Sequence, residues 1–236
     1  MYVLYGGFIF MVGGCLASFF YLLADRLPRK ERIGWSRSHC DTCHHVLSPL
    51  TLIPVLSFLC LGGKCRYCHT KFSPLYLFYE AVGGTLVIYL TWHYPDAYGN
   101  WFLYLLLFLI AVVDQQHFII PDLFQIGLFL LILASHHSNG QLGNPAYLLG
   151  AFAMLLVSGI SALLVRDGLG GGDIKLLGLF GWALGFHGAT LVLFLASLMG
   201  LSSIFMRHHS NKEQLHAPIP FGPFLVLAFF FVREIA

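Results

Sequence analysis

Charged residues are scarce in this sequence of 236 residues, where Asp, Glu, Lys and Arg together make up 10%. A water-soluble domain carries about 25%, so this chain lacks the polar side chains that would cover a soluble surface. Its hydrophobic fraction is 58% and its mean hydropathy is +0.76. This composition predicts a polytopic membrane protein. It excludes a disordered chain, a coiled coil and a secreted disulfide scaffold, and the net charge of +2 is too small to indicate nucleic-acid binding.

Apolar runs recur along the chain, several of them near the ~20 residues that cross a bilayer as a helix. We therefore expect an all-α protein with about eight transmembrane helices. The third, fourth and sixth runs are short, so their helices should extend past the polar residues at their ends. The expected spans are 2–23, 75–92, 101–113, 121–134, 147–165, 174–186, 189–206 and 219–232.

Lys and Arg are unevenly distributed between these spans. Eight of the thirteen lie between the first and second spans, and alternation of the spans places four more on the same side. Only Arg233 falls on the other side, a ratio of twelve to one. Because positive charge accumulates in cytoplasmic loops, we expect a cytoplasmic loop at 24–74 and the N-terminus outside. Asp114 and Asp173 then both lie at cytoplasmic helix ends.

Four cysteines in the first cytoplasmic loop form two CxxC pairs, Cys40–Cys43 and Cys65–Cys68, with 21 residues between the pairs. Each pair supplies two thiolates to one metal ion, and two such pairs complete a tetrahedral site of the zinc-ribbon type. A site filled entirely by sulfur is structural, because no coordination position is left open. The alternatives are a redox pair or unrelated thiols, although the cytoplasm is reducing and disfavours disulfides.

Two aspartates lie at the ends of apolar runs, where a charge is costly and therefore suggests a function. Asp114 follows the third run, and Asp173 follows three consecutive glycines that allow close backbone approach. Two facing carboxylates suit acid–base hydrolysis, since one activates water while the other stays protonated. The alternatives are an ion pair of Asp114 with Lys175 or Arg166, a helix N-cap at Asp173, or a proton relay.

Two further acidic residues and several glycines invite simpler explanations. Asp122 follows Pro121 and suits the first turn of a helix, where the helix dipole favours negative charge. Glu80, near the start of the second span, is either a substrate contact or a structural partner of a loop Arg. Glycines at 6–7, 13–14, 83–84 and 178–188 indicate close helix packing.

Several motifs follow one another in a fixed order along nearly the whole chain. That order resembles the type IV prepilin peptidase family, a group of bacterial inner-membrane aspartic proteases with a Gly-x-Gly-Asp motif. The motifs are Arg37-Ser38-x-Cys40-x-x-Cys43, Gly63-Lys64-Cys65-Arg66-Tyr67-Cys68, Ser73-Pro74-Leu75-Tyr76 with Glu80, Asp114-x6-Pro121-Asp122, Gly170-Gly171-Gly172-Asp173-Ile174-Lys175 and Pro220-Phe221-Gly222-Pro223.

The resemblance implies a reaction, in which Asp114 and Asp173 cleave the basic leader from prepilins or pseudopilins at the cytoplasmic membrane face. It also implies N-methylation of the new N-terminus by S-adenosylmethionine, with Glu80 in the region concerned. The expected cofactors are structural Zn²⁺ and S-adenosylmethionine, and the expected partners are prepilins and membrane lipid. The expected division is a first helix at 1–23, a zinc-binding loop at 24–74 and a protease core at 75–236.

Two other classes of protein remain open at this point. A proton-coupled transporter would use the aspartates as a relay, although no inverted repeat between the halves is evident. A non-enzymatic assembly protein would use the cysteine loop to recruit partners. Both leave the sequence motifs around the two aspartates unexplained.

Overall fold

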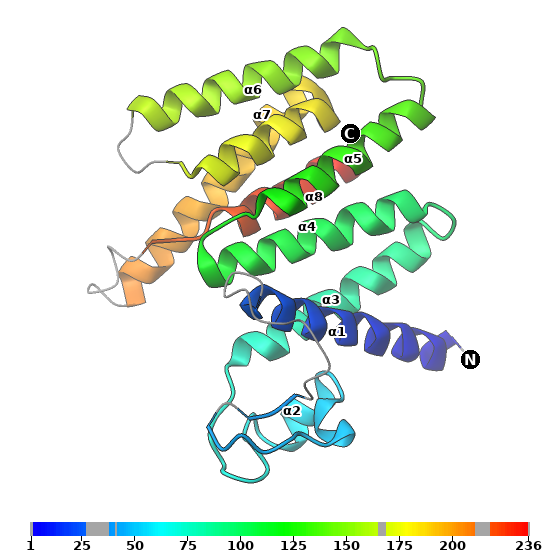
Figure 1. Ribbon diagram of the computed structural model, residues 1–236, viewed down its shortest axis with the longest axis vertical. Coiled ribbons are helices and arrows are strands. Elements are labelled where there is room, and N and C mark those ends of the chain that lie inside the picture. Colours follow the sequence, from blue (N-terminus) through cyan, green and yellow to red (C-terminus); the bar gives the residue numbers. More distant parts are fainter. Residues whose placement is uncertain (1, 27–37, 41, 165–168, 211–217, 236) are drawn as a thin grey trace. The chain divides into compact units, whose positions relative to one another are not determined.

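The computed structural model describes residues 2–26, 38–40, 42–164, 169–210 and 218–235, and across them the chain is helical and without named strands. Figure 1 shows the arrangement of the helices. The elements in chain order are α1 (Tyr2–Arg26), the 3-10 helix η1 (Pro49–Leu52), α2 (Leu56–Cys60), α3 (Pro74–His93), α4 (Tyr98–His117), α5 (Asp122–Ser138), α6 (Pro145–Leu164), α7 (Gly171–Ser210) and α8 (Gly222–Ile235).

The predicted all-α membrane class is confirmed. Five of the described helices, α1, α3, α4, α6 and α7, are long and apolar enough to cross a membrane. The short third run does continue past its polar end, because α4 extends to His117 and so contains Asp114. The basic residues Arg29, Lys30, Arg32, Arg37, Arg166 and Lys212, which contribute to the charge asymmetry, lie outside the described residues.

The chain divides into two compact units, residues 1–101 and 102–236. The three-part division expected from the sequence stays a prediction. In the first unit α1 and α3 pack closely, because glycines allow the two backbones to approach. A Cβ atom at Gly13 would lie 2.5 Å from the carbonyl oxygen of Gly83. A Cβ atom at Gly6 or Gly7 would meet nothing within 4 Å among the described residues, so the expectation of close packing was wrong for that pair.

In the second unit, α7 is two helices joined at Gly185, which has φ 71° and ψ 179°. A Cβ atom at Gly178 would lie 2.6 Å from Leu155, and one at Gly150 would lie 2.6 Å from the carbonyl oxygen of Gly181. The first half of α7 therefore runs antiparallel to α6. The Oγ1 atom of Thr190 lies 4.0 Å from the sulfur of Met154.

The second half of α7 runs parallel to α6. Gly150 lies against Phe186, and Met154, four residues later in α6, lies near Thr190, four residues later in α7. The chain must reverse at Gly185, as the yellow and orange parts of α7 show in Figure 1. This confirms the separate sixth and seventh spans predicted from the sequence. The carbonyl group of Trp182, close before the break, accepts a hydrogen bond from Nε2 of the buried His136 at 2.9 Å.

Helix α8 is held against α4 at both ends. Near its C-terminus the Tyr104 hydroxyl donates a hydrogen bond to Glu234, and the Arg233 guanidinium lies 5.5 Å from the centre of the Tyr104 ring. Near its N-terminus the backbone N–H of Gly222 reaches Asp114. These contacts determine which residue of α8 faces the end of α4.

Candidate active site and metal centre

The four predicted cysteine ligands come together in the first unit. The Sγ atoms of Cys40, Cys43, Cys65 and Cys68 all lie within 4.8 Å of one another, and those of Cys40 and Cys68 are 3.7 Å apart. Four sulfurs at about 2.3 Å from a central Zn²⁺ ion would be spaced in this way. The donor set therefore fits one tetrahedral metal ion.

The two cysteine knuckles have the same local geometry. In each one, the residue after the second cysteine has a positive φ angle, 55° at His44 and 59° at His69. The N–H groups of His44 and His69 donate to the carbonyl oxygens of Cys40 and Cys65. Hydrogen bonds from Thr70 lower the pKa of Cys68 to about 6, and the backbone N–H groups of Cys43 and Thr42 lower the pKa of Cys40. These two thiols are thus biased toward the thiolate form that a metal ion binds, whereas burial and hydrogen bonds with the neighbouring thiols raise the pKa of Cys43 to about 11.

Glu80 is buried in α3, and its Oε2 atom accepts a hydrogen bond of 2.7 Å from the backbone N–H of Val55. Val55 has φ 63°, a conformation that is unfavourable for a β-branched residue. Val55 also precedes α2, so Glu80 helps to hold the cysteine loop on α3. The contact is with the backbone of the loop, whereas the structural partner considered in the sequence analysis was a loop Arg.

Asp114 lies in the last turn of α4 and is 5% exposed. Its Oδ2 atom accepts a hydrogen bond of 2.8 Å from the N–H of Gly222 at the start of α8. A Cβ atom at position 222 would lie 2.8 Å from the same oxygen. The absence of a side chain at Gly222 is therefore what lets the helix start approach the carboxylate.

Asp173 lies in the first turn of α7, three residues after Gly170. Its carboxylate accepts a hydrogen bond from the N–H of Gly170, the reciprocal contact of a helix capping box. Asp173 is thus the third residue of α7, and the N-cap position considered for it in the sequence analysis belongs to Gly170. The Oδ1 atom remains buried and has no hydrogen-bond partner within the described residues.

The two aspartates belong to the same end of the second unit. The charge of Asp114 acts on Asp173 through space. A Cβ atom at Gly172 would lie 3.0 Å from the Cβ atom of Ile120, so the glycine run packs on the segment that follows α4. The end of α4, the start of α7 and the start of α8 meet here, and they bring together two carboxylates that are 59 residues apart in the sequence.

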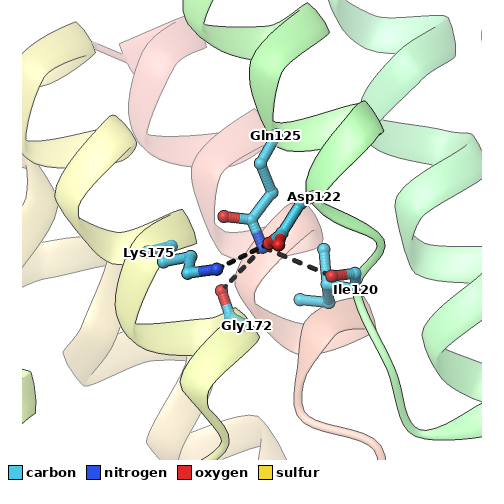
Figure 2. A network of polar contacts seen from close by, with 5 residues as sticks. All are labelled: Ile120, Asp122, Gln125, Gly172 and Lys175. Carbon is cyan, nitrogen blue, oxygen red and sulfur yellow. Dashed lines mark hydrogen bonds and ion pairs between the residues drawn. The ribbon is translucent and has the colours of Figure 1, made fainter.

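Lys175 does not pair with Asp114. Its Nζ atom forms an ion pair of 2.6 Å with Asp122 in the first turn of α5 (Figure 2). The expectation of an Asp114–Lys175 pair is therefore wrong, because Asp122 reaches Lys175 from the neighbouring helix. The other partner considered for Asp114, Arg166, lies outside the described residues.

Two buried polar groups near the site were missed in the sequence analysis. Gln125 in α5 is 5% exposed, and its Oε1 atom has no hydrogen-bond partner among the described residues. The Nε2 atom of His117, one helical turn after Asp114, is likewise buried and unpaired there. An amide inside the apolar run 123–134 was the available signal for Gln125.

The fold and the site define a class: a helical polytopic membrane protein with a four-thiolate loop and two aspartates, one buried and one half-buried, at one end of a helical unit. The comparisons with known proteins agree with this class. The sequence model described as "Bacterial Peptidase A24 N-terminal domain" matches residues 11–94, and that of the "Type IV leader peptidase family" matches residues 101–205.

Curated relatives carry the name prepilin leader peptidase/N-methyltransferase. The Vibrio cholerae protein is 30% identical over 92% of this chain and 91% of its own length. The Bacillus subtilis protein is 32% identical over 91% of this chain and 88% of its own length, and the Pseudomonas aeruginosa protein is 28% identical over 92% and 86%. No solved structure matches the chain. The chain belongs to the type IV leader peptidase family, and it is a membrane-bound peptidase.

Proposed function

We propose that this protein cleaves the basic leader peptide from type IV prepilins or pseudopilins at the cytoplasmic face of the bacterial inner membrane. The observation that supports this most is the pair of carboxylates beside two helix starts, where Asp114 is buried and Asp173 is half-buried with a buried Oδ1 atom. The relatives from Vibrio cholerae, Bacillus subtilis and Pseudomonas aeruginosa are named prepilin leader peptidases. The substrate would combine a leader that stays in the cytoplasm with an apolar helix that enters the membrane among the spans.

In the proposed reaction, one aspartate is ionised and takes a proton from a water molecule. The water oxygen attacks the scissile carbonyl carbon, while the protonated aspartate donates its proton to the carbonyl oxygen. Collapse of the tetrahedral intermediate breaks the C–N bond, and a proton passes to the leaving amine. The unpaired Oδ1 atom of Asp173 is available to the water or to the carbonyl group. No nucleophilic side chain is needed.

Substitution of each aspartate tests this proposal. Asp114→Asn and Asp173→Asn preserve side-chain shape but remove the acid–base group, so we expect cleavage to be abolished while the protein still accumulates in the membrane. The assay is a membrane preparation with a prepilin peptide, read by mass spectrometry. Asp96→Asn, at an exposed loop position, is the matched control and should cleave normally. Full processing by either dyad variant would exclude the dyad.

We further propose that the protein methylates the new N-terminus, as the names of the relatives suggest. S-adenosylmethionine would supply the methyl group. We assign Glu80 to this activity, because the resemblance to the family places the methylation region at the cysteine loop and Glu80, and a carboxylate suits ribose hydroxyls. The same assay with and without S-adenosylmethionine tests the proposal, and a product without the added methyl group in both arms would contradict it.

We also propose that the four-thiolate site holds one structural Zn²⁺ ion, bound by Cys40, Cys43, Cys65 and Cys68. The loop buries little apolar surface of its own, so metal binding would supply much of its folding free energy. We expect one zinc ion per purified chain, and less than half of that in Cys65→Ser. Cys15→Ser should keep the full metal content, because Cys15 lies in α1 away from the cluster. Mass spectrometry of the metal measures both.

A further inference from the structure

Gln125 connects the two aspartate motifs directly. Its Nε2 atom donates one hydrogen bond to the carbonyl oxygen of Ile120, at 3.4 Å, and one to that of Gly172, at 3.3 Å (Figure 2). Ile120 precedes the Pro121-Asp122 pair of the first motif, and Gly172 directly precedes Asp173. One amide group therefore bridges the segment after Asp114 and the segment before Asp173.

The orientation of this amide follows from its partners. Both partners are carbonyl oxygens, which only accept hydrogen bonds, so the NH₂ group and not the amide oxygen must face them. The side chain is 5% exposed. A buried polar group costs folding free energy unless it is paired. A buried amide on an apolar helix therefore indicates that its hydrogen bonds have a role in the structure or the function.

A second link between the same segments is the ion pair of Lys175 with Asp122. Its two side chains are 56% and 71% exposed. Exposed ion pairs contribute little, because solvent screens them and the long side chains lose freedom. A buried hydrogen bond is shielded from this competition. Gln125 is therefore the better candidate for holding the two segments in register.

We propose that Gln125 is a positioning residue that fixes Asp173 relative to Asp114 by holding the glycine run against Ile120. The inference rests on the proposed function of the two aspartates. The glycines at 170–172 leave the backbone intrinsically free, so a contact at Gly172 limits the movement of the next residue. A displaced catalytic group costs rate and need not weaken substrate binding.

Kinetics in membranes test the proposal with Gln125→Met, which keeps the size of the side chain and removes the donor. We expect kcat for leader cleavage of a prepilin peptide to fall about tenfold or more, with KM changed less than about twofold. The control is Gln141→Met, the same change in the loop between α5 and α6, and it should leave both constants unchanged. An unchanged kcat, or a loss that appears only in KM, would overturn the proposal.

A second measurement is independent of catalysis. A Cβ atom at Gly172 would lie 3.0 Å from that of Ile120, so the two segments need to separate by less than about 1 Å to reach the spacing of about 3.8 Å in disulfides. Ile120→Cys with Gly172→Cys should therefore cross-link on oxidation in membranes, and mass spectrometry identifies the linked peptide. Adding Gln125→Met should slow cross-linking about fivefold, the change that one net hydrogen bond corresponds to. An equal rate with and without Gln125 would refute the positioning role.

The two measurements separate the possible failures. If the unaltered protein releases no leader, the proposed function is wrong, whereas the cross-linking result still decides whether Gln125 holds the glycine run. If Gln125→Met does not accumulate, Gln125→Glu replaces it. That change keeps the size and polarity of the side chain but sets an acceptor against two carbonyl oxygens. We expect the same fall in kcat and in cross-linking rate.

Discussion

Gly222 contributes a backbone N–H group and an empty space to the Asp114 carboxylate. The N–H lies 2.8 Å from Oδ2, and a Cβ atom would lie 2.8 Å from the same oxygen and 3.0 Å from Cγ. The contact joins residues 108 positions apart. At the residue scale, the site therefore depends on what Gly222 lacks as much as on the acidic groups themselves.

Gly222→Ala should test this dependence. The added methyl group must displace the carboxylate or the start of α8, and a misplacement of about 1 Å costs roughly a hundredfold in rate. We expect a loss of that order in leader cleavage, with normal amounts of protein in the membrane. Gly159→Ala is the matched control, because a Cβ atom there meets nothing within 4 Å. Equal cleavage by both variants would argue against close positioning of Asp114.

Sequence reasoning identified Asp114 and Asp173 because a charge in an apolar run is expensive and therefore conspicuous. It found the four cysteines because their spacing reports a metal site directly. It could not find the partner of Asp114, since a backbone N–H carries no sequence signal. It considered Lys175 as a partner of Asp114 and not of Asp122, because charge alone does not say which of two carboxylates a lysine reaches.

The reversal at Gly185 is the main determinant of the site at the scale of elements. An unbroken α7 of 40 residues would extend about 60 Å, twice the ~30 Å of a bilayer core. Its end would then lie far from its start, and α8 could not begin beside Asp114. Because the chain turns back, the start of α8 returns to the level of the start of α7. The apolar runs predicted this pair of spans, although not the conformation of the glycine that joins them.

Gly185→Ala should weaken the fold of the second unit. With φ 71° and ψ 179° the position strains any L side chain, even though the nearest atom to an added Cβ is 3.9 Å away. Such strain costs about 1–3 kcal/mol. We expect a lower midpoint of thermal unfolding in detergent, with a parallel loss of cleavage. Gly159→Ala again serves as the control, and an unchanged midpoint for Gly185→Ala would contradict the reversal.

At the scale of the whole molecule, one observation predicts the side of the membrane on which the site lies, and a second limits the number of membrane crossings. The ratio of Lys and Arg, twelve to one, predicts a cytoplasmic site, provided that the chain crosses eight times. The crossing count from α4 to α8 is constrained separately by the Asp114–Gly222 hydrogen bond. An even number of membrane crossings must separate the end of α4 from the start of α8. If α5 crosses as the apolar run 121–134 predicts, α5, α6 and the two halves of α7 supply four.

Labelling of single introduced cysteines checks the orientation. Asp96→Cys and Gln141→Cys lie in the loops before α4 and before α6, which the alternation of spans places outside. Both should react with a membrane-impermeant maleimide in intact cells. Ile119→Cys, in the exposed segment between α4 and α5, should react only after permeabilisation, and the unmodified chain gives the background of its own cysteines. Labelling of position 119 in intact cells would place the aspartates outside, where a leader retained in the cytoplasm could not reach them, and the proposed reaction would fail with it.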